Sequence, residues 1–264
     1  MSYLDDVLYG VIEGITEFLP VSSTGHLLLA EHWLGARSDA YIISIQAGAI
    51  LAVTLVFWRR IVALLVGLHL PENRDYLGKL ALAFGVTAVL GLVVKKLGFE
   101  LPDRVQPIAW ALVLGGVWMI AAERLAARLP DAAAITWRVA LAVGLAQVVA
   151  GVFPGTSRSA ATIFAAMLLG TSNRAAATEF AFLVGIPTMF AASGYELLGE
   201  ISSGAAMEGW ASLGVGFAVS TVTAFVAVKW LLGFIRTHRF TVFAIYRLVF
   251  GGALLALAAS GVVT

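Results

Sequence analysis

Six apolar segments of the chain are each long enough to cross a lipid bilayer, which takes about 20 residues of helix. They run from Tyr41 to Trp58, Leu77 to Val94, Pro107 to Ala122, Ala175 to Leu198, Ala211 to Phe234 and Val242 to Val263. The whole sequence is 60% hydrophobic and 12% charged, whereas about 25% of the residues in a soluble domain are charged. We therefore predict an all-α polytopic membrane protein with six transmembrane helices.

Two further apolar segments, residues 4–34 and 137–169, are interrupted near the middle by a proline and a hydroxyl-rich turn. Irregular backbone at membrane depth is tolerated only where protein or a cavity covers it. Each segment is therefore predicted to be a re-entrant helical hairpin, which enters the membrane and leaves on the same side. The loops are too short to fold alone, so residues 1–264 are expected to form a single integral membrane domain.

The two interrupted segments resemble each other. A shift of 134 residues aligns four unusual pairs: Gly10 with Gly144, Glu13 with Gln147, Pro20 with Pro154, and Ser23 with Ser157. Each half of the chain, about 1–130 and 131–264, then holds one hairpin and three spans. Because three is an odd number, the second half must be inverted relative to the first. This predicts an inverted-topology repeat, an arrangement in which broken helices form a site near the membrane midplane.

Basic residues are distributed unevenly between the two sides of the predicted membrane domain. The side opposite the N-terminus carries Arg59, Arg60, Arg74, Arg124, Arg128, Arg174, Arg236 and Arg239. The N-terminal side carries Arg37, Lys95, Lys96 and Arg104, together with the acidic Glu196, Glu200 and Glu208. Loops rich in arginine and lysine stay in the cytoplasm. We therefore expect both termini outside, and the first hairpin to open at the outer face.

The first interrupted segment places two carboxylates in apolar surroundings. Glu13 and Glu17 are four residues apart, so they lie on one face of a helix. A carboxylate at the bilayer centre costs roughly 2.5 to 3.5 kcal/mol, and such residues usually mark functional sites. Pro20 predicts that this helix ends near Phe18 or Leu19. The structural alternative is a capped kink whose glutamates pair with an arginine.

Hydroxyl side chains and a histidine follow the proline. Ser22, Ser23 and Thr24 are candidate N-caps for a second short helix, which we expect to run to about Trp33 and to include His26. A helix start leaves backbone amide hydrogens free, and these can bind phosphate. Beside two carboxylates, such a turn suits a phosphate that is held together with a divalent cation.

The second interrupted segment carries an arginine at its turn. Arg158 follows Pro154 and lies among the hydroxyls of Thr156, Ser157 and Ser159. A guanidinium stays charged in a dry site and offers a two-pronged donor that matches phosphate. We therefore predict that Arg158 binds a phosphate. A structural role as counter-ion to one of the two glutamates is compatible with this function.

Other features narrow the remaining possibilities. The chain has no cysteine, which excludes disulfides and thiolate metal sites, and its net charge of +1 gives no reason to expect nucleic acid as a partner. Two more charged residues, Glu179 and Arg247, lie in apolar segments. We expect these two either to pair with each other or to lie near helix ends.

The two motifs resemble those of a known family. Residues 13–26, Glu-Gly-Ile-Thr-Glu-Phe-Leu-Pro-Val-Ser-Ser-Thr-Gly-His, and residues 154–159, Pro-Gly-Thr-Ser-Arg-Ser, look like the two signature motifs of the bacterial undecaprenyl-diphosphate phosphatases that are linked to bacitracin resistance. Residues 180–187 and 246–247 also look like this family. The resemblance covers essentially the whole chain.

The resemblance implies dephosphorylation of a C55 isoprenoid diphosphate to its monophosphate at the outer face of the plasma membrane, which recycles the lipid carrier for peptidoglycan precursors. Matched onto this sequence, it implies that Glu13 and Glu17 hold a divalent cation, Mg²⁺ or Ca²⁺, or activate water. Ser23 would be the nucleophile, His26 the acid or base, and Arg158 the phosphate clamp. The hydroxyls expected to contact the substrate are those of Ser22, Thr24, Thr156, Ser157 and Ser159.

Two alternatives stay open at this point. Ser23 is a weak nucleophile without a base, and His26 lies three residues further along, so covalent catalysis and direct attack by water are both compatible with the sequence. A polyprenyl-phosphate transporter or flippase is the rival function, because inverted repeats with charges at the midplane are typical of transporters. The expected partners are a polyprenyl diphosphate and the bilayer, and a homodimer is left open.

Overall fold

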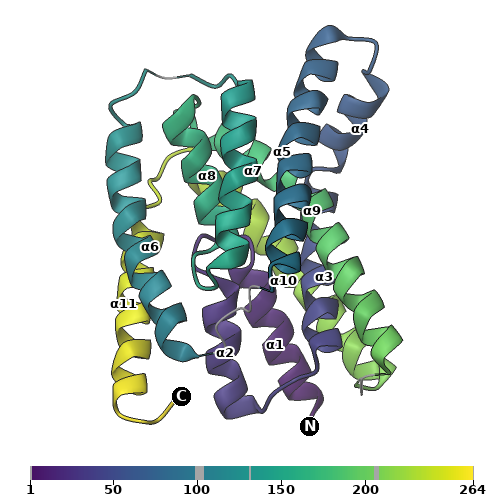
Figure 1. Ribbon diagram of the computed structural model, residues 1–264, viewed down its shortest axis with the longest axis vertical. Helices are drawn as coiled ribbons and strands as arrows, with labels where there is room; N and C mark the ends of the chain where they lie inside the picture. The colour runs from purple at the N-terminus through teal and green to yellow at the C-terminus, as the bar shows by residue number, and fades with distance from the viewer. Residues whose placement is uncertain (1, 99–103, 131, 205–207, 264) are drawn as a thin grey trace.

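The structure is a computed structural model that describes residues 2–98, 104–130, 132–204 and 208–263. In this part of the chain there are eleven α-helices and no strand (Figure 1). Their bounds are α1 Tyr3–Thr16, α2 Ser23–Leu34, α3 Asp39–Val56, α4 Trp58–Val66, α5 Pro71–Lys96, α6 Val105–Ala126, α7 Trp137–Val152, α8 Arg158–Leu169, α9 Arg174–Ser203, α10 Trp210–Phe234 and α11 Thr241–Ala259. The predicted all-α class is confirmed.

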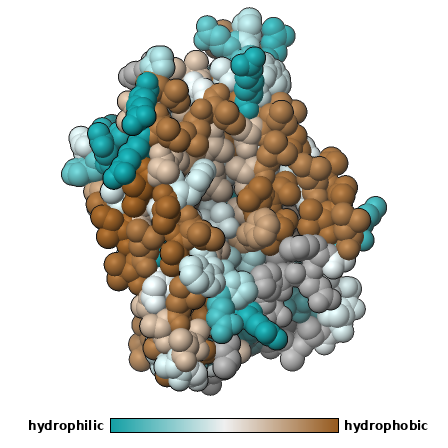
Figure 2. Space-filling model, turned by 60° about the vertical axis from the view of Figure 1, so that its left-hand side comes forward, coloured by the Kyte–Doolittle hydropathy of each residue, from teal (hydrophilic) through white to brown (hydrophobic). Residues whose placement is uncertain are grey.

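The described residues include six helices that are long and apolar enough to cross a membrane, namely α3, α5, α6, α9, α10 and α11. They coincide with the six predicted spans, and they make this a multi-pass membrane protein. Many large apolar side chains on these helices, such as Val89, Leu114 and Val222, are exposed. Figure 2 shows hydrophobic residues over the middle of one face, with hydrophilic residues toward the ends. An exposed apolar surface of this kind is suited to contact with lipid.

Two helix boundaries differ from the prediction. The first span gives way at Phe57 to the short helix α4, which was not predicted and which carries Arg59 and Arg60. Helix α9 extends over 30 residues and passes through Pro187 without ending. A proline inside a helix removes one backbone hydrogen bond. More than half of the residues in the most apolar part of α9 are buried, so packing against neighbouring helices offsets the lost hydrogen bond.

The two interrupted segments form two pairs of short helices, α1 with α2 and α7 with α8. In Figure 1 the turns of both pairs lie near the middle of the molecule, and the pairs approach it from opposite ends. Helix α1 ends at Thr16, slightly earlier than predicted. The reason is that the Thr16 carbonyl would need the amide hydrogen of residue 20, which is Pro20 and has none. The turns meet where Ser159 Oγ donates to the Leu19 carbonyl at 3.1 Å.

Each pair of short helices also packs closely on a long helix from the other half of the chain. A Cβ atom at Gly10 of α1 would lie 2.8 Å from the carbonyl oxygen of Gly216 in α10. A Cβ atom at Gly144 of α7 would lie 2.7 Å from the carbonyl oxygen of Ala83 in α5. The same backbone contact therefore occurs twice, and only glycine leaves room for it.

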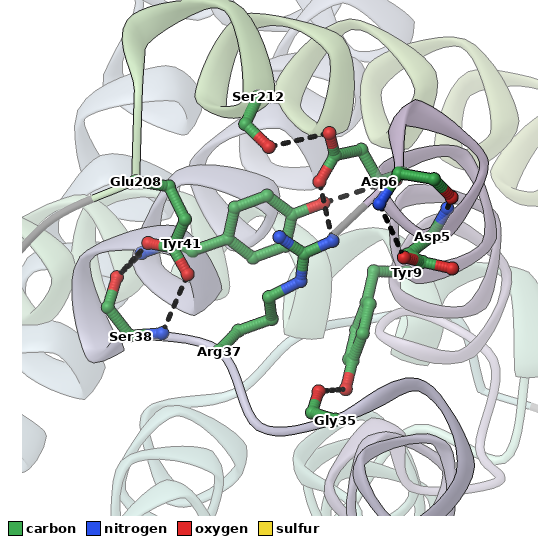
Figure 3. A network of polar contacts seen from close by, with 10 residues as sticks. Asp5, Asp6, Tyr9, Gly35, Arg37, Ser38, Tyr41, Glu208 and Ser212 are labelled. Carbon is green, nitrogen blue, oxygen red and sulfur yellow. Dashed lines mark hydrogen bonds and ion pairs between the residues drawn. The ribbon is translucent and has the colours of Figure 1, made fainter.

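A buried charge network joins α1 to α3 and α10 at the end of the molecule where the chain begins (Figure 3). Arg37 Nη2 lies 2.7 Å from Asp6 Oδ1, and both side chains are almost fully buried. The guanidinium carbon lies 5.4 Å from the ring centre of Tyr9 and 4.6 Å from that of Tyr41. Ser212 Oγ donates to the second carboxylate oxygen of Asp6 at 2.5 Å. This network fixes the start of α1, which carries Glu13 and ends just before Glu17.

Candidate active site

The turns of both short-helix pairs open onto one cavity of about 730 Å³. Its polar part is lined by Glu17, Ser22, Ser23, Thr24, Gly155, Ser157 and Arg158. Its other walls come largely from α5, α7 and α9 and are mainly apolar, with residues such as Phe84, Leu92 and Met189, although Lys95 and Glu196 lie among them. A cavity with charged side chains at one end and mainly apolar walls suits a ligand that has a charged head and an apolar tail.

Glu17 joins the two motifs. Its Oε1 accepts a hydrogen bond from Arg158 Nη2 at 3.0 Å, and its Oε2 accepts one from Ser23 Oγ at 2.6 Å. The counter-ion role considered for Arg158 is thus present, and the partner is Glu17. The side chain of Arg158 is still 28% exposed, whereas that of Glu17 is buried. The guanidinium therefore has donors left for a ligand in the cavity.

Glu13 lies one turn before Glu17 and is only 1% exposed. In the described part of the chain its Oε2 has no hydrogen-bond partner. A buried acceptor without a donor costs about 1 to 3 kcal/mol, and more when it is charged. No group of three or more His, Cys, Asp or Glu side chains lies together among the described residues. Two carboxylates completed by water and phosphate oxygens are nevertheless a common way to hold Mg²⁺, so Glu13 and Glu17 fit a divalent cation.

A left-handed serine shapes each turn. Ser22 has φ 73° and Ser157 has φ 68°, and each immediately precedes a short helix. A non-glycine residue in this region is strained, typically by about 1 to 3 kcal/mol. By backbone conformation Ser157 matches Ser22, whereas the predicted alignment paired Ser157 with Ser23. The reason is that the second turn has one more residue between its proline and its serine.

The predicted hydroxyls divide into two groups. Ser22, Thr24 and Ser157 line the cavity, as Ser23 does. Thr156 and Ser159 are not among the described residues that line it. Ser159 instead hydrogen-bonds Ser157 Oγ at 3.1 Å and the Leu19 carbonyl, so it holds the two turns together.

His26 makes its contacts away from Ser23. Its Nδ1 lies 2.7 Å from the Ser22 carbonyl oxygen, and its Nε2 lies 2.6 Å from the hydroxyl of Tyr246. It borders a separate apolar pocket of about 280 Å³ between α1 and α2. Within the described residues the Ser23 hydroxyl bonds Glu17 and makes no hydrogen bond to His26. The sequence allowed a contact between His26 and Ser23, and the structure shows a different partner for each.

Arg247 of α11 is a residue whose place the sequence analysis missed. It is fully buried and donates to the carbonyls of Gly155 and Thr156 in the second turn, both at 2.9 Å. It also donates to the Ala111 carbonyl of α6 at 3.1 Å. Gly115 leaves room for it, because a Cβ atom there would lie 2.2 Å from Nη2. Arg247 therefore fixes the backbone on which Arg158 stands.

Of the two alternatives for Glu179 and Arg247, pairing with each other is wrong, whereas Glu179 does lie near a helix end, at the sixth residue of α9. Glu179 Oε1 instead lies 2.8 Å from Nε of Arg60 in the short helix α4, and both side chains are partly exposed. Because α4 was not predicted, the sequence offered Glu179 no other partner. A single arginine within a long apolar segment was the signal that could have identified Arg247, since such a charge is usually functional.

Gln147, which the predicted repeat aligns with Glu13, is also buried. Its Nε2 donates to Thr87 Oγ1 at 2.9 Å and lies 3.4 Å from Thr188 Oγ1. In the described part of the chain its Oε1 has no partner. These two aligned positions therefore each hold a buried oxygen acceptor that has no donor among the described residues.

Comparison with known proteins agrees with this description. The family described as bacitracin resistance protein BacA matches residues 6–253. A protein of Rhizobium johnstonii, named undecaprenyl-diphosphatase, is 66% identical over 264 residues, and the match covers 100% of both chains. Proteins of the same name from Stenotrophomonas maltophilia and Xanthomonas oryzae pv. oryzae are each 61% identical, over 98% and 94% of both chains. The chain therefore belongs to the bacitracin resistance protein BacA family.

Proposed function

We propose that this protein hydrolyses undecaprenyl diphosphate to undecaprenyl phosphate and inorganic phosphate, and so recycles the lipid carrier for peptidoglycan synthesis at the outer face of the bacterial plasma membrane. The observation that carries the proposal is the cluster of Glu17, Ser23 and Arg158 at the polar end of a cavity whose other walls are mainly apolar. The name shared by its relatives supports the same substrate.

The cavity offers each part of such a lipid a matching surface. Arg158, the hydroxyls of the first turn and the amides at the start of α2 would bind the diphosphate. The prenyl chain would follow the apolar side chains of α5 and α9 toward the lipid. Glu13 and Glu17 would hold a divalent cation, Mg²⁺ or Ca²⁺, which when bound supplies positive charge to the phosphate oxygens.

In this proposal Glu17 acts as the base for Ser23. Its Oε2 already accepts the hydrogen bond of the Ser23 hydroxyl and would take that proton as Ser23 Oγ attacks the terminal phosphorus. The bond to the bridging oxygen breaks, undecaprenyl phosphate leaves, and water later releases the phosphate from the serine. In the alternative route Glu17 takes the proton from an attacking water, and Ser23 donates a hydrogen bond to the phosphate.

We further propose that the single membrane domain is an inverted repeat with two re-entrant hairpins. Three observations support this arrangement: the equivalent contacts of Gly10 and Gly144, the equivalent backbone of Ser22 and Ser157, and the meeting of the two turns near the middle of the molecule. Such repeats also occur in transporters, which keeps polyprenyl-phosphate transport as the second candidate function.

The proposed orientation places both termini and the cavity mouth outside. Helix α1 begins and α11 ends at the same end of the molecule (Figure 1). The cavity is also lined by Lys95 and Glu196, which the sequence places on that side. Because the chain has no cysteine, single cysteines at Ser203 and His238 can report the orientation. A membrane-impermeant thiol reagent added to intact cells should label Ser203→Cys and leave His238→Cys unlabelled, and the reverse pattern would overturn the orientation.

The decisive experiment for the function is phosphate release by the purified protein in detergent, with a polyprenyl diphosphate as substrate and a divalent cation present. We expect stoichiometric release of inorganic phosphate, and loss of release on chelation that is restored by adding the cation. A transporter without phosphatase activity would release none, and would instead move a polyprenyl phosphate across the membrane of a proteoliposome.

A further inference from the structure

Both ring nitrogens of His26 are already engaged. The Ser22 carbonyl can only accept a hydrogen bond, so Nδ1, which lies 2.7 Å away, must carry a hydrogen. In the neutral ring Nε2 is then an acceptor, and the hydroxyl of Tyr246, 2.6 Å away, donates to it. Neither nitrogen is left to exchange a proton with a substrate.

The packing of the ring holds this arrangement in place. Helix α11 presents two aromatic side chains to His26: the ring of Phe250 stacks on the imidazole with 4.2 Å between centres, and that of Tyr246 lies parallel to it at 5.6 Å. The described residues that line the large cavity include Ser23 and Glu17 but not His26. His26 therefore faces α11 and the apolar pocket, on the other side of the first turn.

We propose that His26 and Tyr246 are positioning residues for the first turn, and that His26 is not the acid or base of the reaction. The Nδ1 hydrogen bond holds the carbonyl of Ser22, whose backbone is in the strained left-handed region, and Tyr246 fixes the ring that makes this bond. The first turn then orients the Ser23 hydroxyl toward Glu17. This inference rests on the proposed phosphatase function and assigns Tyr246 a role in it.

Helix α11 thus supports both turns, through two adjacent residues. Tyr246 acts on the first turn through His26, and Arg247 bonds two carbonyls of the second turn directly. A shift of α11 would therefore disturb the relative position of Ser23 and Arg158. For this reason loss of the Tyr246 hydroxyl should lower turnover more than substrate affinity.

Replacement of His26 by asparagine or alanine separates positioning from acid–base chemistry. Asparagine can place an amide N–H near the position of Nδ1 but has no group that titrates. We expect His26→Ala to lower kcat by roughly 10- to 100-fold, as for one lost buried hydrogen bond, and His26→Asn to recover to within about fivefold of the unaltered protein. An acid or base predicts equal losses of about 10²- to 10⁴-fold in both variants, which would overturn the inference.

Tyr246→Phe removes only the hydroxyl. We expect kcat to fall by about 3- to 10-fold with KM nearly unchanged. Tyr3→Phe makes the same change at an exposed tyrosine near the N-terminus and should have no effect. Unchanged kcat in Tyr246→Phe would contradict the role of Tyr246.

Nitrogen NMR of the histidine rings tests the inference without relying on catalysis. The chain has four histidines, and the signal lost in His26→Asn identifies His26. We expect the neutral Nδ1–H form, with an Nε2 signal that shifts in Tyr246→Phe. The Nε2–H form would contradict the inference. Absence of phosphate release by the unaltered protein would instead count against the proposed function, and the NMR result would still decide the arrangement of the ring.

Discussion

Two buried charge clusters, one around Asp6 near the start of α1 and one around Glu13 and Glu17 at its end, differ in whether any of their members lines a cavity. In the network at the start of α1, Asp6 contacts both Arg37 and Ser212, and the guanidinium lies against two tyrosine rings. In the second cluster Glu17 is paired with Arg158, but Glu13 has a buried oxygen without a donor in the described structure. Arg158 also keeps part of its surface toward the cavity.

This difference identifies the cluster around Asp6 as structural and the cluster around Glu13 and Glu17 as functional. In the Asp6 network the carboxylate and the guanidinium pair with each other, although Arg37 Nε has no hydrogen-bond partner in the described structure, and none of its described members lines the large cavity. It can therefore fasten α1 to its neighbours but has no surface for a ligand. In the second cluster Glu17 and Arg158 do line that cavity. Charged side chains that line a cavity, rather than buried charge as such, are therefore what point to the active site here.

The strongest way to test this comparison is to replace Glu17. Glu17→Gln removes the charge that would hold the cation and the base that would take the proton, so we expect phosphate release to fall by roughly 10⁴-fold. Folding should be retained, because the amide oxygen can still accept from Arg158. Glu179→Gln is the control, since its partner Arg60 lies at the surface. Near-normal turnover in Glu17→Gln would remove Glu17 from the mechanism.

Ser23→Ala decides between the two chemical routes. If Ser23 is the nucleophile, as we expect, turnover should fall by more than about 10³-fold while substrate binding is retained. If water attacks and Ser23 only donates a hydrogen bond, the loss should be nearer the 10²- to 10³-fold that is typical of one deleted donor. Measuring turnover and binding separately provides the readout. Retention of a few per cent of activity would exclude the covalent route.

Arg158→Lys keeps the charge but loses the planar, two-pronged donor. We expect a loss of roughly 10²-fold in kcat/KM, because a lysine in this position cannot bond Glu17 and a phosphate in the same geometry. Arg60→Lys, at the partly exposed pair with Glu179, makes the same change outside the site and should leave kcat/KM unchanged. Equal activity of Arg158→Lys and the unaltered protein would show that charge alone suffices.

Substitutions in the Asp6 network should have the opposite effect, because they should lower stability rather than activity. Asp6→Asn leaves Arg37 buried without a counter-ion, so we expect the free energy of unfolding to fall by about 3 to 5 kcal/mol. Activity per folded molecule should be unchanged. Replacing both residues, Asp6→Leu with Arg37→Met, should recover much of the stability. Thermal unfolding in detergent measures the change, and a specific loss of turnover would refute the structural assignment.

The smallest effect is expected at the edge of the same network. Burial alone would raise the pKa of Glu208, but hydrogen bonds from the Ser38 hydroxyl and amide outweigh it and hold this pKa below its usual value. A lowered pKa in the folded state stabilises the protein above the pKa of the unfolded chain, and this stability is lost as the pH falls through the folded value. Glu208→Gln should remove that acid dependence and cost at most about 1 kcal/mol at neutral pH. Unfolding temperatures at pH 7 and below pH 4.5 test this.

Much of the fold could be predicted from the sequence, because bilayer length and hydropathy select the six spans with little ambiguity. The break at Pro20 was also predictable, since a missing amide hydrogen ends a helix wherever the chain lies. Helix α4 was missed because the predicted span ended at Trp58, before Arg59 and Arg60, and the helix that follows has nine residues, too few to be recognised as a span. Boundaries of this kind depend on packing rather than on local composition.

The site was predictable in its residues but not in its contacts. Spacing placed Glu13 and Glu17 on one face, and residue chemistry suggested that Arg158 binds a phosphate or one of the glutamates. Which oxygen meets which donor depends on how the two turns approach each other, and separations such as the 141 residues between Glu17 and Arg158 have no local signature. Arg247 bonds only backbone carbonyls in the described structure, so no complementary charge in the sequence pointed to its partners.

Arg247 has a further consequence for the electrostatic field of the cavity. Peptide carbonyls solvate its charge but do not cancel it, so its positive charge adds to that of Arg158 on the side of the second turn. On the side of the first turn, the carboxylate of Glu17 faces the guanidinium of Arg158. The two sides of the cavity therefore carry opposite charge, and a dipole lies across it. A phosphate bound together with a cation is itself a dipole, so this field would set the direction in which the head group enters as well as the strength with which it is held.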